Sequence, residues 1–233
     1  MIARLKHWLK NSDNPLAQRL FRMAKAVRGG SVPMVPGLHH ALFAIHTGIA
    51  RGVSELLRAT YWTPLFKTQL AECGSALRLE GGMPQVLGPH LRIEVGNNVS
   101  MSAQMTINGR PQTRAPELII GDNVVLGWLT GISVGRRIVI GDNVMFGGRN
   151  SLFGYSGHPL DAVARAAGEA ESDAAVGDII VGRNCWIGTG VIITGPATIG
   201  ENTIVAAGSV VTSDLPANVL AGGVPARVIK TLS

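Results

Sequence analysis

The sequence predicts a mainly β protein, a solenoid with three flat faces, preceded by an α-helical N-terminal extension. Aliphatic residues recur every six positions in the C-terminal half, at Val181, Ile187, Ile193, Ile199, Val205 and Val211. Neither the helix period of 3.6 nor the strand period of 2 produces a strict period of six. A repeating coil does, because one aliphatic side chain per face points inward and a small residue beside it lets the chain turn.

The same pattern extends upstream. The phrase aliphatic, Gly, polar, Asn begins at Val95, Ile120, Ile140, Val181 and Ile199. The last two positions are separated by 18 residues, which is one turn of three six-residue faces. The longer gaps before them predict loops near residues 110–117 and 136–139 and between 156 and 178.

The composition fits a thin interior and a reducing compartment. The chain has 30 glycines and 5% aromatic residues, which suits a core of Ile, Val and Leu without many rings. The two cysteines, Cys73 and Cys185, give no disulfide framework. We therefore expect a cytoplasmic protein.

The positive charge is concentrated at the N-terminus. Residues 1–30 hold seven basic residues and one acidic residue, so they carry the +6 that is the net charge of the whole chain. The coil is neutral, which argues against nucleic-acid binding. Leu16, Leu20, Met23 and Val27 lie at helical spacing among these charges. This segment either makes a peripheral contact with the inner membrane face or packs on its own coil with a solvated basic face.

Four segments follow from these patterns: a basic, amphipathic helical extension (1–62), a cap or linker (63–90), the coil (91–216, with its loop 156–178) and a C-terminal tail (217–233). The helical stripe between residues 38 and 62 is interrupted by charged and polar residues, so we expect no membrane span. The histidines of this region lack metal-ligand spacing.

Three sequence pieces carry a family resemblance. The first is Gly157-His158-Pro159-Leu160-Asp161 with Arg165, and the second is Asn184-Cys185-Trp186-Ile187-Gly188. The third runs from Ala207-Gly208-Ser209-Val210-Val211-Thr212 to Ala226-Arg227-Val228-Ile229. Together they resemble the hexapeptide-repeat, left-handed β-helix acyltransferases, and most closely the sugar and galactoside O-acetyltransferases. The resemblance covers about residues 91–232. It implies a left-handed coil, a homotrimer, acetyl-CoA as co-substrate and no required metal.

His158 is the candidate general base. Acyl transfer to a hydroxyl needs a group that accepts its proton, and an imidazole with a pKa of about 6.5 suits that step at neutral pH. His158 is the only histidine within the repeats, and it begins the longest insertion. The resemblance implies direct transfer in a ternary complex. A backbone carbonyl or one of five carboxylates is expected to orient the ring: Asp161, Glu169, Glu171, Asp173 or Asp178.

The remaining donor-side residues come from the resemblance. Trp186 is expected to line the pantetheine tunnel or to steady the His158 ring, although simple packing between coils is an alternative. Backbone N–H groups at Gly188-Thr189 are expected to stabilise the oxyanion. The CoA contacts fall on Thr189, Ala207, Thr212, Arg227 and Lys230. Related sequences often have Lys at Ser213 and Arg at Lys230, so phosphate attraction is expected to be weaker here.

On the acceptor side, the chain departs from the family. Trp128 stands near the place where related enzymes carry an Asn, and its indole could stack on a sugar ring. The other predicted acceptor contacts are Asn150, Tyr155 and Arg165.

The sequence therefore predicts acetyl-CoA-dependent O-acetylation of a saccharide, such as a surface polysaccharide or its precursor. N-acetylation of a nucleotide-linked amino sugar is the nearest alternative, and a non-catalytic β-helix scaffold is another. A covalent route through Cys185 is disfavoured because the repeat turns that residue inward. A zinc hydratase on the same coil needs several histidines, and the coil has only one.

Overall fold

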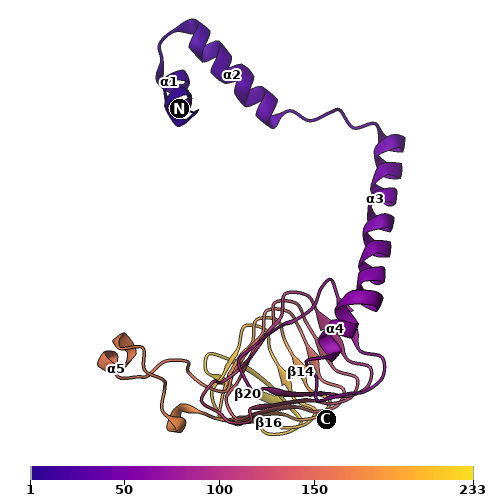
Figure 1. Cartoon of the computed structure of the whole chain (residues 1–233), viewed down its shortest axis with the longest axis vertical. Helices are drawn as coiled ribbons and strands as arrows, with labels where there is room; N and C mark the ends of the chain where they lie inside the picture. The colour runs from indigo at the N-terminus through magenta and orange to yellow at the C-terminus, as the bar shows by residue number, and fades with distance from the viewer. Residues whose placement is uncertain (1, 233) are drawn as a thin grey trace. The chain divides into compact units, whose positions relative to one another are not determined.

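The computed structural model describes residues 2–232, which divide into two compact units, Met1–Arg51 and Gly52–Ser233 (Figure 1). The first unit contains α1 (Ile2–Asn11), α2 (Pro15–Gly29) and most of α3 (Pro36–Leu57). Asn14 caps α2, where its side chain accepts a hydrogen bond from Leu16 N at 2.9 Å. Pro15 follows at the first helical position, which favours a helix start because proline has no N–H to leave unpaired. The predicted helical extension is confirmed.

The second unit is a three-faced parallel β-helix, as predicted. It begins with a one-turn π-helix, η1 (Arg58–Trp62), and α4 (Thr63–Lys67). Face A consists of β1 (Glu72–Cys73), β4 (Arg92–Val95), β7 (Glu117–Ile120), β10 (Arg137–Ile140), β13 (Ile179–Val181) and β16 (Ala197–Ile199). Face C consists of β3 (Gln85–Leu87), β6 (Thr106–Gly109), β9 (Gly131–Val134), β12 (Ser151–Phe153), β15 (Ile192–Thr194) and β18 (Val210–Val211).

Face B has two further strands. It consists of β2 (Arg78–Glu80), β5 (Ser100–Ser102), β8 (Val125–Leu126), β11 (Met145–Phe146), β14 (Trp186–Ile187), β17 (Ile204–Val205), β19 (Val219–Gly223) and β20 (Ala226–Thr231). All pairings are parallel except β19 with β20, which form an antiparallel hairpin. The C-terminal tail therefore extends face B by one hairpin.

The core is a stack of aliphatic side chains, one layer per coil. Ile187, Ile193 and Ile199 illustrate one turn, since each lies on a different face and each is fully buried. Burial of one such side chain contributes about 1.5–3 kcal/mol. Phe66 of α4 is also fully buried and belongs to the same core, so α4 closes the N-terminal end of the coil.

The corner between faces A and B explains the repeated Asn. The Asn of each coil adopts a left-handed backbone with φ between 54° and 59°, a region that Asn tolerates better than most residues. The amides also bond from coil to coil at 2.9–3.0 Å. This Asn ladder consists of Asn98, Asn123, Asn143, Asn184, Asn202 and Asn218.

The coil starts earlier than the sequence predicts. Strands β1, β2 and β3 pair in register with the next coil, so residues 72–87 form a full turn rather than a cap or linker. Here Ala76 takes the left-handed position (φ 57°) that Asn98 occupies one coil later. The turn was missed because it lacks the Asn of the repeated phrase.

The insertions leave the coil at the corner between faces C and A. Residues 110–116 connect β6 to β7, and residues 154–178 connect β12 to β13 with α5 (Ala162–Ala166) and the short 3₁₀ helix η2 (Asp173–Ala175). The third expected bulge is only the two-residue connection 135–136. Figure 1 shows α5 standing out from the side of the coil. The long insertion predicted between residues 156 and 178 is confirmed.

Among residues 2–232, no helix combines the length and the apolar character needed to cross a bilayer. The longest helix, α3, has no buried residue along its 22 positions.

Candidate active site

A column of aligned corner residues runs between faces B and C. The strand register aligns Trp128, Gly148, Thr189 and Ala207 at successive coils. The indole of Trp128 lies over Gly148, since a Cβ added there would be 2.6 Å from the indole nitrogen. The Arg149 guanidinium is 4.8 Å from the centre of the Trp128 ring, a cation–π contact. The corner therefore carries an aromatic ring at Trp128 and small residues at Gly148 and Ala207.

Backbone donors accompany this column. Gly188 N donates to Val205 O, Gly190 N donates to Gly148 O, and Gly208 N donates to Thr189 O. Among the hydrogen bonds of the described residues, the N–H groups of Thr189 and Ala207 have no acceptor. Both residues are exposed on the surface of the coil. Of the Gly188-Thr189 pair, only Thr189 retains a free donor.

Trp186 belongs to an outward row on face B. The register places Met145, Trp186, Ile204, Leu220 and Lys230 side by side across five strands. Trp186 is 57% exposed and Met145 is 56% exposed. The row is thus an apolar strip on the surface of a single chain, with Lys230 at its end.

The C-terminal hairpin brings Arg227 to the same corner as the column. Arg227 faces Gly222 across the hairpin, and Gly222 stacks on Ala206, next to Ala207. Its guanidinium is exposed and donates to Ala226 O at 2.8 Å. Thr212 does not lie at this corner, because it follows β18, the edge strand of face C. The structure therefore groups Thr189, Ala207, Arg227 and Lys230 around face B and leaves Thr212 apart.

His158 lies in the 154–178 insertion, at the corner between faces C and A. It borders two hollows, one of about 440 Å³ and one of about 360 Å³. The larger hollow is lined by Pro111, Gln112, Tyr155, Gly157, His158, Arg165, Gly168, Glu169, Ala170 and Glu171. His158 and the Thr189 column are therefore at different corners of one coil.

Local hydrogen bonds shape the backbone around His158. Ser156 Oγ donates to His158 O at 2.9 Å. Arg165 Nη1 donates to the carbonyls of Pro159 and Leu160 at 2.9 and 3.0 Å, and Asp161 caps α5 by accepting from Ala164 N at 2.8 Å. Arg165 therefore supports the loop, while its side chain also borders the larger hollow.

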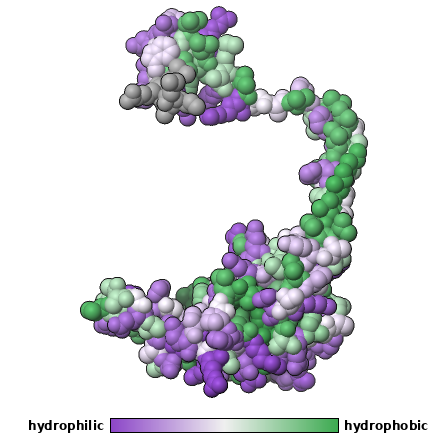
Figure 2. Space-filling model, in the orientation of Figure 1, coloured by the Kyte–Doolittle hydropathy of each residue, from purple (hydrophilic) through white to green (hydrophobic). Residues whose placement is uncertain are grey.

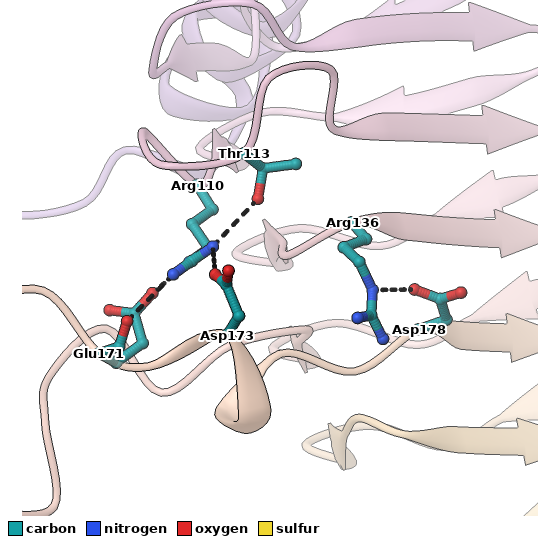
Figure 3. A network of polar contacts seen from close by, with 6 residues as sticks. All are labelled: Arg110, Thr113, Arg136, Glu171, Asp173 and Asp178. Carbon is teal, nitrogen blue, oxygen red and sulfur yellow. Dashed lines mark hydrogen bonds and ion pairs between the residues drawn. The ribbon is translucent and has the colours of Figure 1, made fainter.

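A buried ion pair fixes the loop to the coil (Figure 3). Arg110 is 3% exposed and Glu171 is 5% exposed, and Arg110 Nε donates to the Glu171 carboxylate. Arg110 also donates to Glu171 O at 3.0 Å and to Asp173 Oδ1 at 2.8 Å. Burial alone lowers the pKa of Arg110, but these bonds outweigh it and the net pKa is raised. We refer to Arg110, Glu171 and Asp173 as the loop clamp.

The clamp was missed from the sequence, because Arg110 and Glu171 are 61 residues apart. It also affects Tyr155, whose pKa is raised mainly by burial and further by the nearby Glu171 carboxylate. The sequence showed only an Arg at the start of the predicted loop near residues 110–117 and several acidic residues in the predicted loop between 156 and 178.

Most of the carboxylates that could orient His158 are already engaged. Asp161 caps α5, Glu171 and Asp173 bind Arg110, and Asp178 pairs with Arg136 at 3.5 Å. Glu169 borders the same hollow as His158. Among the described contacts, Glu169 is the one of the five carboxylates whose side chain has no other partner.

Asn150 requires a correction. It is fully buried, its Nδ2 donates to Gly147 O at 2.6 Å, and its Oδ1 accepts from Val191 N at 2.8 Å. The amide is satisfied inside the corner, so it has no free group for an acceptor.

Cys185 points inward, as the repeat predicts. It is 1% exposed, its Sγ donates to Gly200 O at 3.1 Å, and burial raises its pKa. A buried thiol with a raised pKa forms little thiolate, so it is a poor nucleophile.

The comparisons with known proteins agree with this architecture. The family described as "Bacterial transferase hexapeptide (six repeats)" matches residues 178–213. Galactoside O-acetyltransferase of Escherichia coli strain K12 is 40% identical over 114 residues, covering 49% of this chain and 54% of the relative. The chain resembles the hexapeptide-repeat sugar O-acetyltransferases.

Another galactoside O-acetyltransferase, from Lactococcus lactis, is 34% identical over 96 residues, covering 41% of this chain and 44% of the relative. The chain thus spans about half the length of these two relatives.

Among solved structures, the N-acyltransferase AntD of Bacillus cereus, bound to dTDP-4-amino-4,6-dideoxyglucose and coenzyme A, aligns with a TM-score of 0.60. It is 22% identical and the alignment covers 73% of this chain and 89% of AntD. At that identity the likeness shows a shared fold.

Proposed function

We propose that this protein is an acetyl-CoA-dependent O-acetyltransferase that acts on a saccharide. The observation that carries the proposal is the corner column of Thr189 and Ala207, exposed and with free backbone N–H groups, in a chain 40% identical to a galactoside O-acetyltransferase over 114 residues. A surface polysaccharide or its precursor is the proposed acceptor.

The donor fits along face B and its corner. The free N–H groups suit the amide carbonyls of an extended pantetheine arm, and the small Ala207 allows a close approach. Arg227 and Lys230 supply exposed cations for the phosphates of CoA, Arg in a forked geometry and Lys as a point charge. Thr212 remains a proposed CoA contact that must be reached from the neighbouring face.

The chemistry rests on His158. One ring nitrogen takes the proton of the acceptor hydroxyl as its oxygen attacks the thioester carbonyl, forming a C–O bond. The Thr189 N–H stabilises the resulting oxyanion. The C–S bond then breaks, and the imidazolium returns the proton to the departing thiolate of CoA. Glu169 is the proposed partner that orients the ring, and the chain itself is never acylated.

A homotrimer completes the site. The His158 loop leaves the coil at one corner and the Thr189 column lies at another. The column of one copy therefore needs the His158 loop of a second copy. The exposed strip that includes Met145 and Trp186 on face B supplies an apolar surface for such a contact. In this arrangement Trp186 lines the seam between two copies.

The acceptor is proposed to enter from the hollow beside His158. Tyr155 and Arg165 border this hollow, whereas Trp128 offers a ring for sugar stacking at the other corner. Asn150 is left out because its amide is internally bonded.

N-acetylation of a nucleotide-linked amino sugar is the alternative, because AntD, an N-acyltransferase, shares the fold. The linkage in the product separates the two, since an O-acetyl ester is lost in mild alkali and an amide survives. The proposed location is cytoplasmic, and a membrane contact of residues 1–30 is argued below.

The deciding experiment measures acetyl-CoA consumption against a panel of sugars, nucleotide sugars and glycans. With an accepted sugar, His158→Ala should lower kcat about a hundredfold to ten-thousandfold, because general-base catalysis contributes about that much. His40→Ala, at an exposed position on α3, is the matched control and should keep full activity. Unchanged turnover in a folded His158→Ala variant would remove the mechanism and favour a scaffold.

A further inference from the structure

The α1–α2 hairpin leaves an apolar stripe uncovered. Leu16, Leu20, Met23 and Val27 are spaced by four, three and four residues, so they lie on one side of α2. Their side chains are between 47% and 80% exposed. By contrast, Ala17 on another side of α2 is 1% exposed, where α1 packs against this helix. The stripe therefore lies about a quarter turn around α2 from its buried position, at about 100° per residue.

Basic side chains surround this stripe. Residues 1–30 carry seven basic residues against Asp13 alone. At about 100° per residue, Arg19 and Arg28 flank the stripe and Lys25 lies opposite it. Because residues 31–233 are neutral overall, the charge of the chain is concentrated where its apolar side chains are exposed.

α3 adds further apolar surface. Leu38, Leu42, Ile45 and Ile49 follow the same spacing and are 51–63% exposed. Figure 2 shows this apolar surface in green along α3 and on part of the hairpin.

We propose that the α1–α2 hairpin docks on the surface of an anionic lipid bilayer. The apolar stripe would insert at the level of the headgroups, and the flanking Arg and Lys side chains would meet lipid phosphates. Binding to an anionic bilayer needs both an apolar stripe and basic side chains, and the α1–α2 hairpin carries both. The proposal goes beyond acetyl transfer and does not rest on it.

Two other occupants fit less well. Hairpins of neighbouring copies each carry +6, so direct packing of stripe on stripe would bring like charges together. A nucleic acid would satisfy the charge, but its phosphate backbone makes no use of an apolar stripe.

The test uses the full chain in co-sedimentation with vesicles of phosphatidylcholine alone or mixed with phosphatidylglycerol. We expect binding only to the mixed vesicles, and weaker binding at high salt because surface charges are screened. Arg19→Gln with Arg28→Gln should weaken partitioning about thirtyfold, which corresponds to about 1 kcal/mol per lost charge. Leu20→Glu with Val27→Glu should abolish it.

Two control variants place one change of each kind at an exposed position on the coil, namely Arg114→Gln and Met83→Glu. Both should bind like the parent chain. Equal binding to the two vesicle types overturns the proposal. A loss of vesicle binding in the control variants overturns it as well. A change of oligomeric mass in the α2 variants without vesicle binding overturns it in favour of self-association. Acetyl transfer measured on the same samples reports separately on the proposed activity.

Discussion

At the scale of the residue, the Asn ladder does two separate things. Each Asn accepts a left-handed backbone, and its amide bonds to the next coil. Ala76 shows that the backbone can take this shape without the amide, at the first and least regular coil. The repeated Asn thus contributes to stability in two ways, through its left-handed backbone and through its inter-coil hydrogen bonds. Substitution can separate these two contributions.

Asn143 provides that separation. Asn143→Gly keeps a residue that tolerates φ 58° but loses two inter-coil bonds of 3.0 Å, at about 1 kcal/mol each. Asn143→Ala loses the same bonds and adds about 1–2 kcal/mol for the left-handed backbone. Urea unfolding should therefore rank parent above Gly above Ala. An Ala variant as stable as the Gly variant would contradict the strain argument.

At the scale of the element, the loop clamp ties the middle of the 154–178 insertion to the shorter insertion beside it. Arg110 is in the shorter 110–116 insertion, so the two excursions at the C–A corner hold each other through a buried charge pair. Such a pair is costly to break from one side, since the remaining charge stays buried without its partner. A loop without helical or sheet pairing to the coil thereby gains a defined place.

Arg110→Ala should destabilise the protein by about 3–5 kcal/mol and should expose residues 154–178 to protease. The double variant Arg110→Met with Glu171→Leu should recover much of that stability, because no buried charge is left alone. Asp173→Asn is the milder control, as the Asp173 side chain is 90% exposed. Limited proteolysis and urea unfolding measure both effects. Equal sensitivity of the Ala and Asn variants would mean that the clamp does not hold the loop.

At the scale of the whole molecule, the coil separates the two groups that the proposed mechanism brings together. The His158 loop departs from the C–A corner and the donor column lies at the B–C corner. The proposed mechanism therefore requires a second copy to bring its loop to the column, and the exposed apolar strip on face B is the surface proposed for that contact.

Met145→Glu places a charge at one end of that strip, next to Trp186. The variant should shift the protein from trimer to monomer in light scattering and lose acetyl transfer with it. Ser133→Glu, on the outward side of face C, is the matched control and should remain trimeric. A monomeric parent chain, or a trimeric and active Met145→Glu variant, argues against the proposed seam.

Part of the fold and of the candidate site could be predicted from the sequence, and part could not. The coil from Val95 onward followed from its period, and the inward position of Cys185 followed with it. The first turn was missed at Ala76, and Asn150 was taken for an acceptor contact because its spacing says nothing about what its amide touches. Arg110 was missed because its partner lies 61 residues away.

The sequence by itself determined the three-faced coil, its inward side chains and the stretch of chain that holds its longest insertion. It could do so because a period of six repeats one local geometry, and each repeat fixes the next. Only the tertiary structure decided that Thr189 keeps a free N–H, that Asn150 is internally satisfied and that Glu171 is spent on Arg110. Those outcomes depend on contacts between distant segments, which no local spacing encodes.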